Sequence, residues 1–196
     1  MEVETARRID RGDIGAAAHS LAAAFYDDPV VSFSWPDSRK RFRRSERFFA
    51  GQIHTLWDRR EVHALDDYSS VAVWARPDEW QIPPKALLRV VATSVLTRVR
   101  VKALLEYLRT DALHPEEPHW YLEFLGTVPD KQGKGLGARA LAPGLARADE
   151  EGVPIWTWSS NRKNLAFYHR HGFEVLEERP FTAGGPPIFP IRRDPR

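Results

Sequence analysis

A glycine-rich turn is the segment of this chain with the clearest chemical meaning. Residues 132–138 read Gln-Gly-Lys-Gly-Leu-Gly-Ala and lie between an apolar segment, 120–128, and the start of a predicted helix. Glycines let the backbone turn tightly with its N–H groups pointing outward, and a helix N-terminus adds partial positive charge there. The turn therefore predicts a phosphate or pyrophosphate site. A turn that only connects a strand to a helix is the alternative.

Two nucleotide-binding interpretations of this turn are disfavoured. An NTPase phosphate loop requires a Lys followed by Ser or Thr, whereas Lys134 is followed by Gly135. A dinucleotide fingerprint is matched in form by Gly133, Gly135 and Ala138, but the next predicted strand ends at Trp158 with no acidic residue to bind a ribose. Coenzyme A is the third phosphate-bearing ligand that this turn suits.

Asn164 and Tyr168 are four residues apart in the predicted helix 162–171, so they share one face, with Phe167 beside them. A tyrosine there is either a proton donor or a core aromatic whose hydroxyl finds a backbone partner.

Glu123 is the only carboxylate in the predicted strand 120–128. It lies either on a solvated face or near a site that raises its pKa. His119 is the alternative base, because an unperturbed His pKa of about 6.5 suits proton removal.

The segments 128–138 and 164–173 together resemble the GCN5-related N-acetyltransferase (GNAT) superfamily. The first matches its acetyl-CoA motif, which is Arg or Gln, two residues, Gly, one residue, then Gly or Ala. The resemblance implies a mixed α/β acyl-CoA N-acyltransferase fold, acetyl-CoA as cofactor and direct acetyl transfer to a primary amine. It implies Tyr168 as the general acid for the departing thiolate, and either Glu123 or an ordered water as the base.

The resemblance also implies which residues contact the cofactor. These are Leu125, Gly126, Thr127, Gln132, Gly133, Lys134, Gly135, Leu136, Gly137, Ala138, Asn164 and Phe167. The strands 120–128 and 153–158 are implied to splay apart around its arm. The chain has no cysteine for an acyl-enzyme.

Outer segments of the chain, among them 21–25, 71–74 and 141–144, look like puromycin N-acetyltransferase-like proteins. This resemblance implies a small-molecule amine acceptor, such as an antibiotic or aminonucleoside. We expect Trp158, His119 and Trp74 to contact it.

Trp158 replaces a Glu of the puromycin-acetylating relatives and follows Trp156 on one strand face. Stacking on the acceptor and burial in the core are both open for these indoles. A peptide or protein N-acetyltransferase and a non-catalytic acyl-CoA-sensing module are the alternative functions.

The amino-acid composition limits the classes of protein and of site that the chain can form. The 196 residues predict a single acetyltransferase domain spanning 1–196. Lys and Arg total 29 against 27 Asp and Glu, a balance that disfavours nucleic-acid binding by charge. The basic run 39–47 is interpreted as the solvent-exposed face of a helix. Zero Cys excludes thiolate zinc sites, and we expect no metal. Lack of a long apolar run or signal segment predicts a cytoplasmic protein with no membrane partner, monomeric or homodimeric.

Hydrophobic spacing predicts the elements that position these residues. Up to residue 113 we expect a strand at 3–9, helices at 14–26 and 39–57, a hairpin of 61–66 with 70–75, and a helical insertion, 84–113, that breaks near Thr97 and walls the acceptor pocket. Beyond it we expect strands at 120–128, 153–158, 173–176 and 188–191, with helices at 135–151 and 162–171. This alternation predicts a sheet that is parallel in part.

Overall fold

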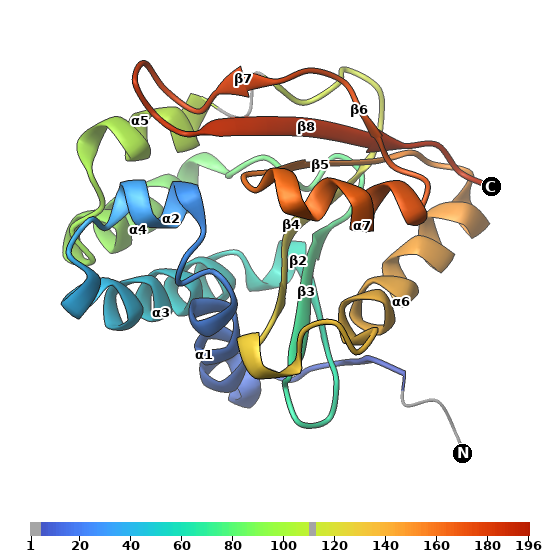
Figure 1. The fold of residues 1–196 in the computed structure, drawn as a ribbon, viewed down its shortest axis with the longest axis horizontal. Coiled ribbons are helices and arrows are strands. Elements are labelled where there is room, and N and C mark those ends of the chain that lie inside the picture. The colour runs from blue at the N-terminus through green and yellow to red at the C-terminus, as the bar shows by residue number, and fades with distance from the viewer. Residues whose placement is uncertain (1–4, 110–112) are drawn as a thin grey trace.

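The computed structural model describes residues 5–109 and 113–196 and contains a mixed sheet flanked by helices (Figure 1). The predicted α/β class is confirmed. The strand order is β1-β2-β3-β4-β5-β8-β6, and β7 pairs with β8. The strands are β1 (Arg7–Arg8), β2 (Arg60–Ala64), β3 (Ser70–Ala75), β4 (Trp120–Thr127), β5 (Ile155–Ser159), β6 (Glu174–Val175), β7 (Arg179–Pro180) and β8 (Pro187–Arg193). The helices are α1 (Ile14–Ala24), α2 (Pro29–Ser34), α3 (Ser38–Thr55), α4 (Pro84–Leu96), α5 (Val101–Arg109), α6 (Leu136–Glu151) and α7 (Leu165–Arg170).

The pairing of β4 with β5 is parallel and brief. Trp120 lies opposite Ile155 and Tyr121 opposite Trp156, and the pairing stops there. In Figure 1, β2, β3 and β4 run up the view, whereas β5 and β8 run across it. The implied splay is confirmed, and an opening separates the two strands.

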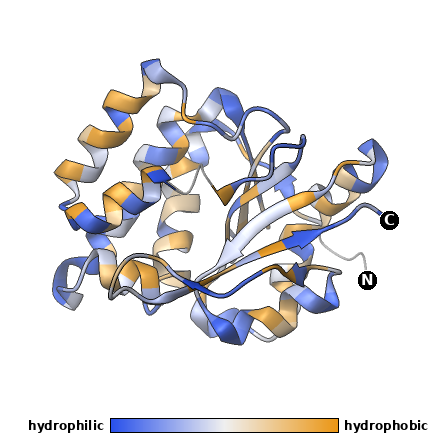
Figure 2. Cartoon of the chain, turned by 90° about the horizontal axis from the view of Figure 1, so that it is seen from above, coloured by the Kyte–Doolittle hydropathy of each residue, from blue (hydrophilic) through white to orange (hydrophobic). Residues whose placement is uncertain are grey.

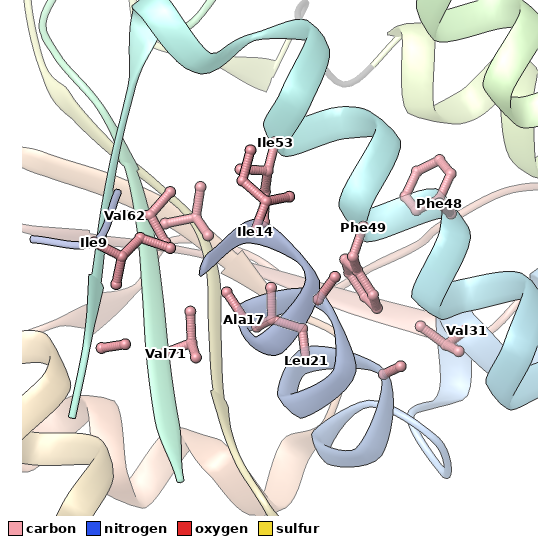
Figure 3. Close-up of a cluster of buried hydrophobic side chains, with 14 of the residues drawn as sticks. Ile9, Ile14, Ala17, Leu21, Val31, Phe48, Phe49, Ile53, Val62 and Val71 are labelled. Atoms are coloured by element: carbon pink, nitrogen blue, oxygen red, sulfur yellow. The ribbon is translucent and has the colours of Figure 1, made fainter. Parts of the chain in front are cut away.

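Helices cover both faces of the sheet. On one face, Ile14 and Leu21 of α1 and Phe49 of α3 pack toward Val62 and Val71 of the strands (Figure 3). On the other face, α6 packs on the alternate side chains of β3 and β4, and Tyr168 of α7 joins the same cluster together with side chains of β5 and β8. In Figure 2 the helices carry hydrophobic and hydrophilic segments in turn, as expected for amphipathic helices that cover a sheet.

The helix α2 was missed by the sequence prediction. Asp28-Pro29 was interpreted only as the end of the preceding helix. The Asp28 carboxylate accepts hydrogen bonds from the backbone N–H groups of Val30 (2.9 Å) and Val31 (3.1 Å), and Pro29 occupies the first helical position. These are the preferred residues at a helix start, so Asp28 and Pro29 begin α2, whereas α1 ends earlier, at Ala24.

The predicted break near Thr97 is confirmed. Thr97 caps the C-terminus of α4, and Arg98 follows with a positive φ of 55°. The chain then turns into α5. The first predicted strand is shortened to Arg7–Arg8 among the described residues, and residues 3 and 4 lie outside them. The exposed Arg39, Arg43 and Arg47 lie on α3, as interpreted.

Candidate active site

The glycine-rich turn lies between β4 and α6, as predicted. Gly133 and Gly135 have φ values of 76° and 78°, in the left-handed region that only glycine adopts freely. Gly135 is also the N-cap of α6, so the first backbone N–H groups of that helix face out of the turn without intrahelical acceptors. This turn forms one wall of a groove of about 860 Å³.

The structure brings the predicted cofactor residues together along this groove. Its lining includes Leu125, Gly126, Thr127, Gln132, Gly133, Gly135, Leu136, Gly137, Ala138, Asn164 and Phe167. Lys134 is the exception, because its ammonium turns away and donates to the Asp130 carbonyl oxygen at 3.3 Å. Residues spread over three elements thus line one groove.

The groove is also lined by residues to which the sequence analysis gave no role. They are Ala23 and Phe25 at the end of α1, Asp28 at the start of α2, and Arg170 and His171 at the end of α7. Four of them lie in the segments 21–25 and 164–173, but the resemblance assigned none of them to the cofactor. A Cβ at Gly126 would lie 2.8 Å from the Ala24 Cβ, so this glycine is what lets α1 approach β4.

The groove fits coenzyme A in its size and its donors. Outward N–H groups and the positive end of the α6 dipole suit a pyrophosphate. A volume of about 860 Å³ lies within the usual range for cofactor sites. The opening between β4 and β5 gives an extended arm a route from the turn toward the middle of the sheet.

A second, smaller cavity of about 100 Å³ adjoins the groove. Five residues line both spaces: Phe25, Asp28, Leu125, Asn164 and Tyr168. We call the smaller space the acceptor cavity. The two spaces therefore meet at Tyr168.

Tyr168 is a buried residue of α7, and 8% of its surface is exposed. Burial, and to a lesser degree the nearby Asp28 carboxylate, raise the pKa of Tyr168 well above its ordinary value. The hydroxyl is therefore protonated at neutral pH and able to give a proton to an anion formed beside it.

Glu123 occupies a β-bulge. Val73 lies opposite Phe124 and Trp74 opposite Leu122, so Glu123 has no partner across β3. Two residues of one strand then share a single opposing position, and the side chains beyond are re-aimed. Leu122, Glu123, Phe124 and Leu125 consequently all line the acceptor cavity.

The Glu123 carboxylate is held by two buried groups. Arg60 Nε donates to Oε2 at 2.5 Å, and the Tyr107 hydroxyl donates to Oε1 at 3.0 Å. The Arg60 guanidinium also donates to the carbonyl oxygens of Glu79 (2.9 Å) and Trp80 (3.0 Å). The sequence analysis missed Arg60 and Tyr107, because they come from a strand and a helix distant in sequence.

Asp28 is the second carboxylate of the acceptor cavity. In addition to the α2 amides, it accepts a hydrogen bond from the Ser160 hydroxyl. Burial raises its pKa. The sequence indicated only that Asp28-Pro29 marks a helix boundary. It did not indicate that Asp28 lies where the groove and the acceptor cavity meet.

Trp156 and Trp158 of β5 lie in different surroundings, one in the core and one at the acceptor cavity. Trp158 lines the acceptor cavity and stacks on Phe181, with ring centroids 6.0 Å apart. Trp156 is 1% exposed and packs on His114 at 4.1 Å, so it belongs to the core.

Two of the predicted acceptor contacts need correction. Trp74 is fully buried on the α6 face, where a Cβ on Gly144 would lie 2.2 Å from its Cε2. His119 is 1% exposed, its Nε2 pairs with His114 Nδ1 at 2.8 Å, and its Nδ1 pairs with the Glu117 carbonyl oxygen at 2.8 Å. Neither residue lines the groove or the acceptor cavity. Both faces of the strands are buried here. The aromatic character of Trp74 and His119 therefore did not show whether their side chains point into the cavity or into the core.

Within residues 5–109 and 113–196, no helix combines the length and apolarity required to span a bilayer. The same residues contain no group of three or more His, Asp or Glu side chains arranged to hold a metal ion.

Comparisons with known proteins agree with this geometry. The sequence model of the acetyltransferase (GNAT) family matches residues 22–173. An uncharacterized N-acetyltransferase of Schizosaccharomyces pombe is 27% identical, over 86% of this chain and 73% of its own length.

Solved structures share the fold. One from Corynebacterium glutamicum, described as a histone acetyltransferase and related acetyltransferase, is 24% identical with a TM-score of 0.71, over 98% of this chain and 96% of its own. The PaiA N-acetyltransferase of Thermoplasma acidophilum, solved in complex with coenzyme A, is 12% identical with a TM-score of 0.56, over 99% of both chains. This chain belongs to the acetyltransferase (GNAT) family and is an N-acetyltransferase that uses acetyl-CoA.

Proposed function

We propose that this protein transfers the acetyl group of acetyl-CoA directly to a primary amine of a small molecule held in the acceptor cavity. Residues 1–196 act as one unit in this proposal, with 84–113 walling the acceptor site. The observation that carries it is the meeting of the groove and the acceptor cavity at Tyr168. A reaction between two bound substrates requires such a junction, because the attacking atom must lie within contact distance of the carbon it attacks.

Tyr168 at the junction and Glu123 in the acceptor cavity supply the proton transfers. Acetyl-CoA brings an activated thioester. The acceptor nitrogen forms a bond to the acetyl carbon as the carbon–sulfur bond breaks, and the departing thiolate takes the Tyr168 hydroxyl proton. Glu123 receives the proton that the nitrogen loses, directly or through an ordered water. Arg60 and Tyr107 hold the Glu123 carboxylate in place for this step.

The small volume of the acceptor cavity favours a small molecule over a peptide. Val30 and Val31 of α2, Ala103 and Tyr107 of α5, and Phe181 beyond β7 all line it. A peptide substrate needs a channel with open ends for the chain on both sides of the reacting residue. The histone acetyltransferase among the structural neighbours keeps a protein acceptor as the second candidate. The antibiotic or aminonucleoside class remains a prediction from the resemblance.

Thiol release from acetyl-CoA in the presence of a panel of amines tests the proposal. We expect release that depends on an added small amine. Tyr168→Phe is expected to lower kcat by about 10²- to 10⁴-fold, the usual contribution of a general acid. Its Kd for acetyl-CoA, measured by calorimetry, should stay within about twofold. Tyr68→Phe is the matched control, because Tyr68 lies outside both spaces, and it should keep the wild-type rate.

Three other results would contradict the proposal. Tight acetyl-CoA binding without release for any amine would favour the acyl-CoA-sensing alternative. Release only with peptides or proteins would favour the second candidate. Full activity of Tyr168→Phe would remove Tyr168 from the mechanism.

A further inference from the structure

The described lining of the acceptor cavity includes two carboxyl groups and no basic side chain. Among its described lining residues, Asp28 and Glu123 are the only ionisable side chains besides two tyrosines, and none is Lys, Arg or His. An acceptor that carries a carboxylate or phosphate would be buried against two carboxylates. A cationic acceptor would instead be attracted by these carboxylates.

The two carboxylates differ in what balances their charge. The guanidinium of Arg60 neutralises Glu123, and both side chains are nearly fully buried, with 2% and 4% exposed. The partners of Asp28 are neutral: two backbone N–H groups and the Ser160 hydroxyl. Among the described residues, no Lys, Arg or His nitrogen pairs with Asp28. A buried carboxylate without a counter-ion is costly, so this position suits a cation from outside the chain.

The remaining lining is largely aromatic. Trp35 and Phe48 meet edge to face at 5.3 Å, and Phe49 meets Phe124 in the same way at 5.0 Å. Trp158 completes the lining near Phe181. Such rings favour another ring through stacked or edge contacts, and their faces also attract an ammonium.

The volume of the acceptor cavity limits the size of the acceptor. An apolar cavity of about 150 Å³ can hold benzene, so a cavity of about 100 Å³ has room for about one small ring at most. The amine-bearing chain of such an acceptor would extend toward the groove, which the cavity meets at Asp28 and Tyr168. A phenyl ring with a two-carbon amine suits this arrangement, whereas a complete aminonucleoside antibiotic exceeds it.

We propose that the acceptor is a compact arylalkyl primary amine without negative charge, whose ammonium pairs with Asp28 while its ring lies among the aromatic side chains of the acceptor cavity. This inference rests on the proposed function and names its substrate class. Asp28 binds the amine at the boundary with the groove, and the proton then leaves by the route given above. Asp28 thereby determines specificity, and its cap on α2 fixes its position.

Binding of phenethylamine and of its neutral analogue 2-phenylethanol tests the role of Asp28 without turnover. Quenching of tryptophan fluorescence reports occupancy, because Trp35 and Trp158 line the acceptor cavity. We expect the wild type at pH 7 to bind the amine on the order of 10- to 100-fold more tightly than the alcohol, the usual effect of a hydrogen bond to a charged group.

Asp28→Asn removes the charge alone, because Asn also caps helices well and can accept from the same backbone N–H groups. This variant should reduce the preference for the amine to within about threefold. Ser160→Ala is the matched control: it removes a partner of Asp28 but keeps the charge, so most of the preference should remain.

Measurement of turnover is the second part of the test. Phenethylamine should be acetylated with a higher kcat/KM than an aminoglycoside, spermidine, puromycin or an N-terminal peptide. Asp28→Asn should raise KM for phenethylamine more than it lowers kcat. Turnover of a large or polar amine but not of phenethylamine would overturn the substrate class and leave the proposed function intact. Equal binding of amine and alcohol would overturn the role of Asp28. Lack of release with any amine would overturn the proposed function itself.

Discussion

The groove and the acceptor cavity lie on either side of Tyr168, yet they are built in different ways. The groove takes many of its lining residues from one segment, 125–138, and four of these are glycines. The acceptor cavity is lined by large side chains from α2, α3, α5, β4 and β5. A ligand common to a whole family needs only backbone donors in a fixed shape, whereas an individual acceptor needs particular side chains.

This difference also determines what each space tolerates. A change of side chain in the groove acts through backbone conformation. In the acceptor cavity it acts through packing and charge. The predictions below test whether the two spaces respond separately.

The largest effect is expected from Arg60→Met, which leaves the Glu123 carboxylate buried without its cation. The free energy of unfolding, measured by urea denaturation, should fall by about 3–5 kcal/mol. The double variant Arg60→Met/Glu123→Leu should recover most of this loss, because it removes the uncompensated charge. Arg43→Met, at an exposed position of α3, should change stability by no more than about 0.5 kcal/mol. A loss below about 1 kcal/mol for the single variant would mean that water reaches Glu123.

A smaller effect is expected from Gly135→Ala in the groove. Any other residue is strained at a φ of 78°, at a cost of about 1–2 kcal/mol, although a Cβ there meets no protein atom within 4 Å. The turn should shift, and acetyl-CoA binding measured by calorimetry should weaken. Amine binding in the acceptor cavity should be retained.

Gly15→Ala is the matched control for this variant. Gly15 lies in α1, and a Cβ there also has open space. Its φ is not positive, so alanine should leave stability unchanged or raise it by up to about 1 kcal/mol. Equal losses in the two variants would show that the positive φ of Gly135 is unimportant.

A further prediction concerns pH and the aromatic cluster that backs Trp158. Burial lowers the pKa of His114 to about 3 and also lowers the pKa of His119. In the unfolded chain these histidines take up protons near pH 6.5, so the unfolded state binds more protons between about pH 6.5 and 3. Stability is therefore complete above pH 6.5. It is lost as pH falls, at up to about 1.4 kcal/mol per pH unit for one such group.

Urea denaturation between pH 7 and 4 measures this slope. His114→Phe keeps a ring against Trp80, on which His114 stacks at 3.8 Å, and should give a shallower slope. His54→Phe, at an exposed site on α3, should leave the slope as it is. An unchanged slope in His114→Phe would assign the acid sensitivity to other groups.

The residues predicted to contact the cofactor, Lys134 excepted, gather along one groove because most of them lie in one local motif. Residues 132–138 specify a turn, a helix start and a set of N–H groups without reference to the rest of the chain. The break of the 84–113 segment at Thr97 is similarly local, and it was also predicted correctly.

The acceptor cavity could be predicted only in part, because its lining depends on tertiary contacts. The Glu123 bulge is one extra residue in a strand, and strand periodicity does not reveal it. Asp28 was interpreted only as the end of the preceding helix. An Asp-Pro pair indicates a helix boundary, and nothing in the sequence shows that the same carboxylate also lines a cavity. Trp74 and His119 were wrong because an aromatic strand residue is equally compatible with a core and with a binding site.

The early end of the β4–β5 pairing has a thermodynamic consequence. Beyond Tyr121, β4 has no strand partner on the β5 side among the described residues. An extended ligand with amide groups that lies in this opening can act as an added strand and complete the sheet. Ligand binding then contributes to folding: at 100 times its Kd, a ligand that binds only the folded state adds about 2.7 kcal/mol to stability. The supply of acetyl-CoA would thus set what fraction of the molecules is folded as well as how fast the enzyme works.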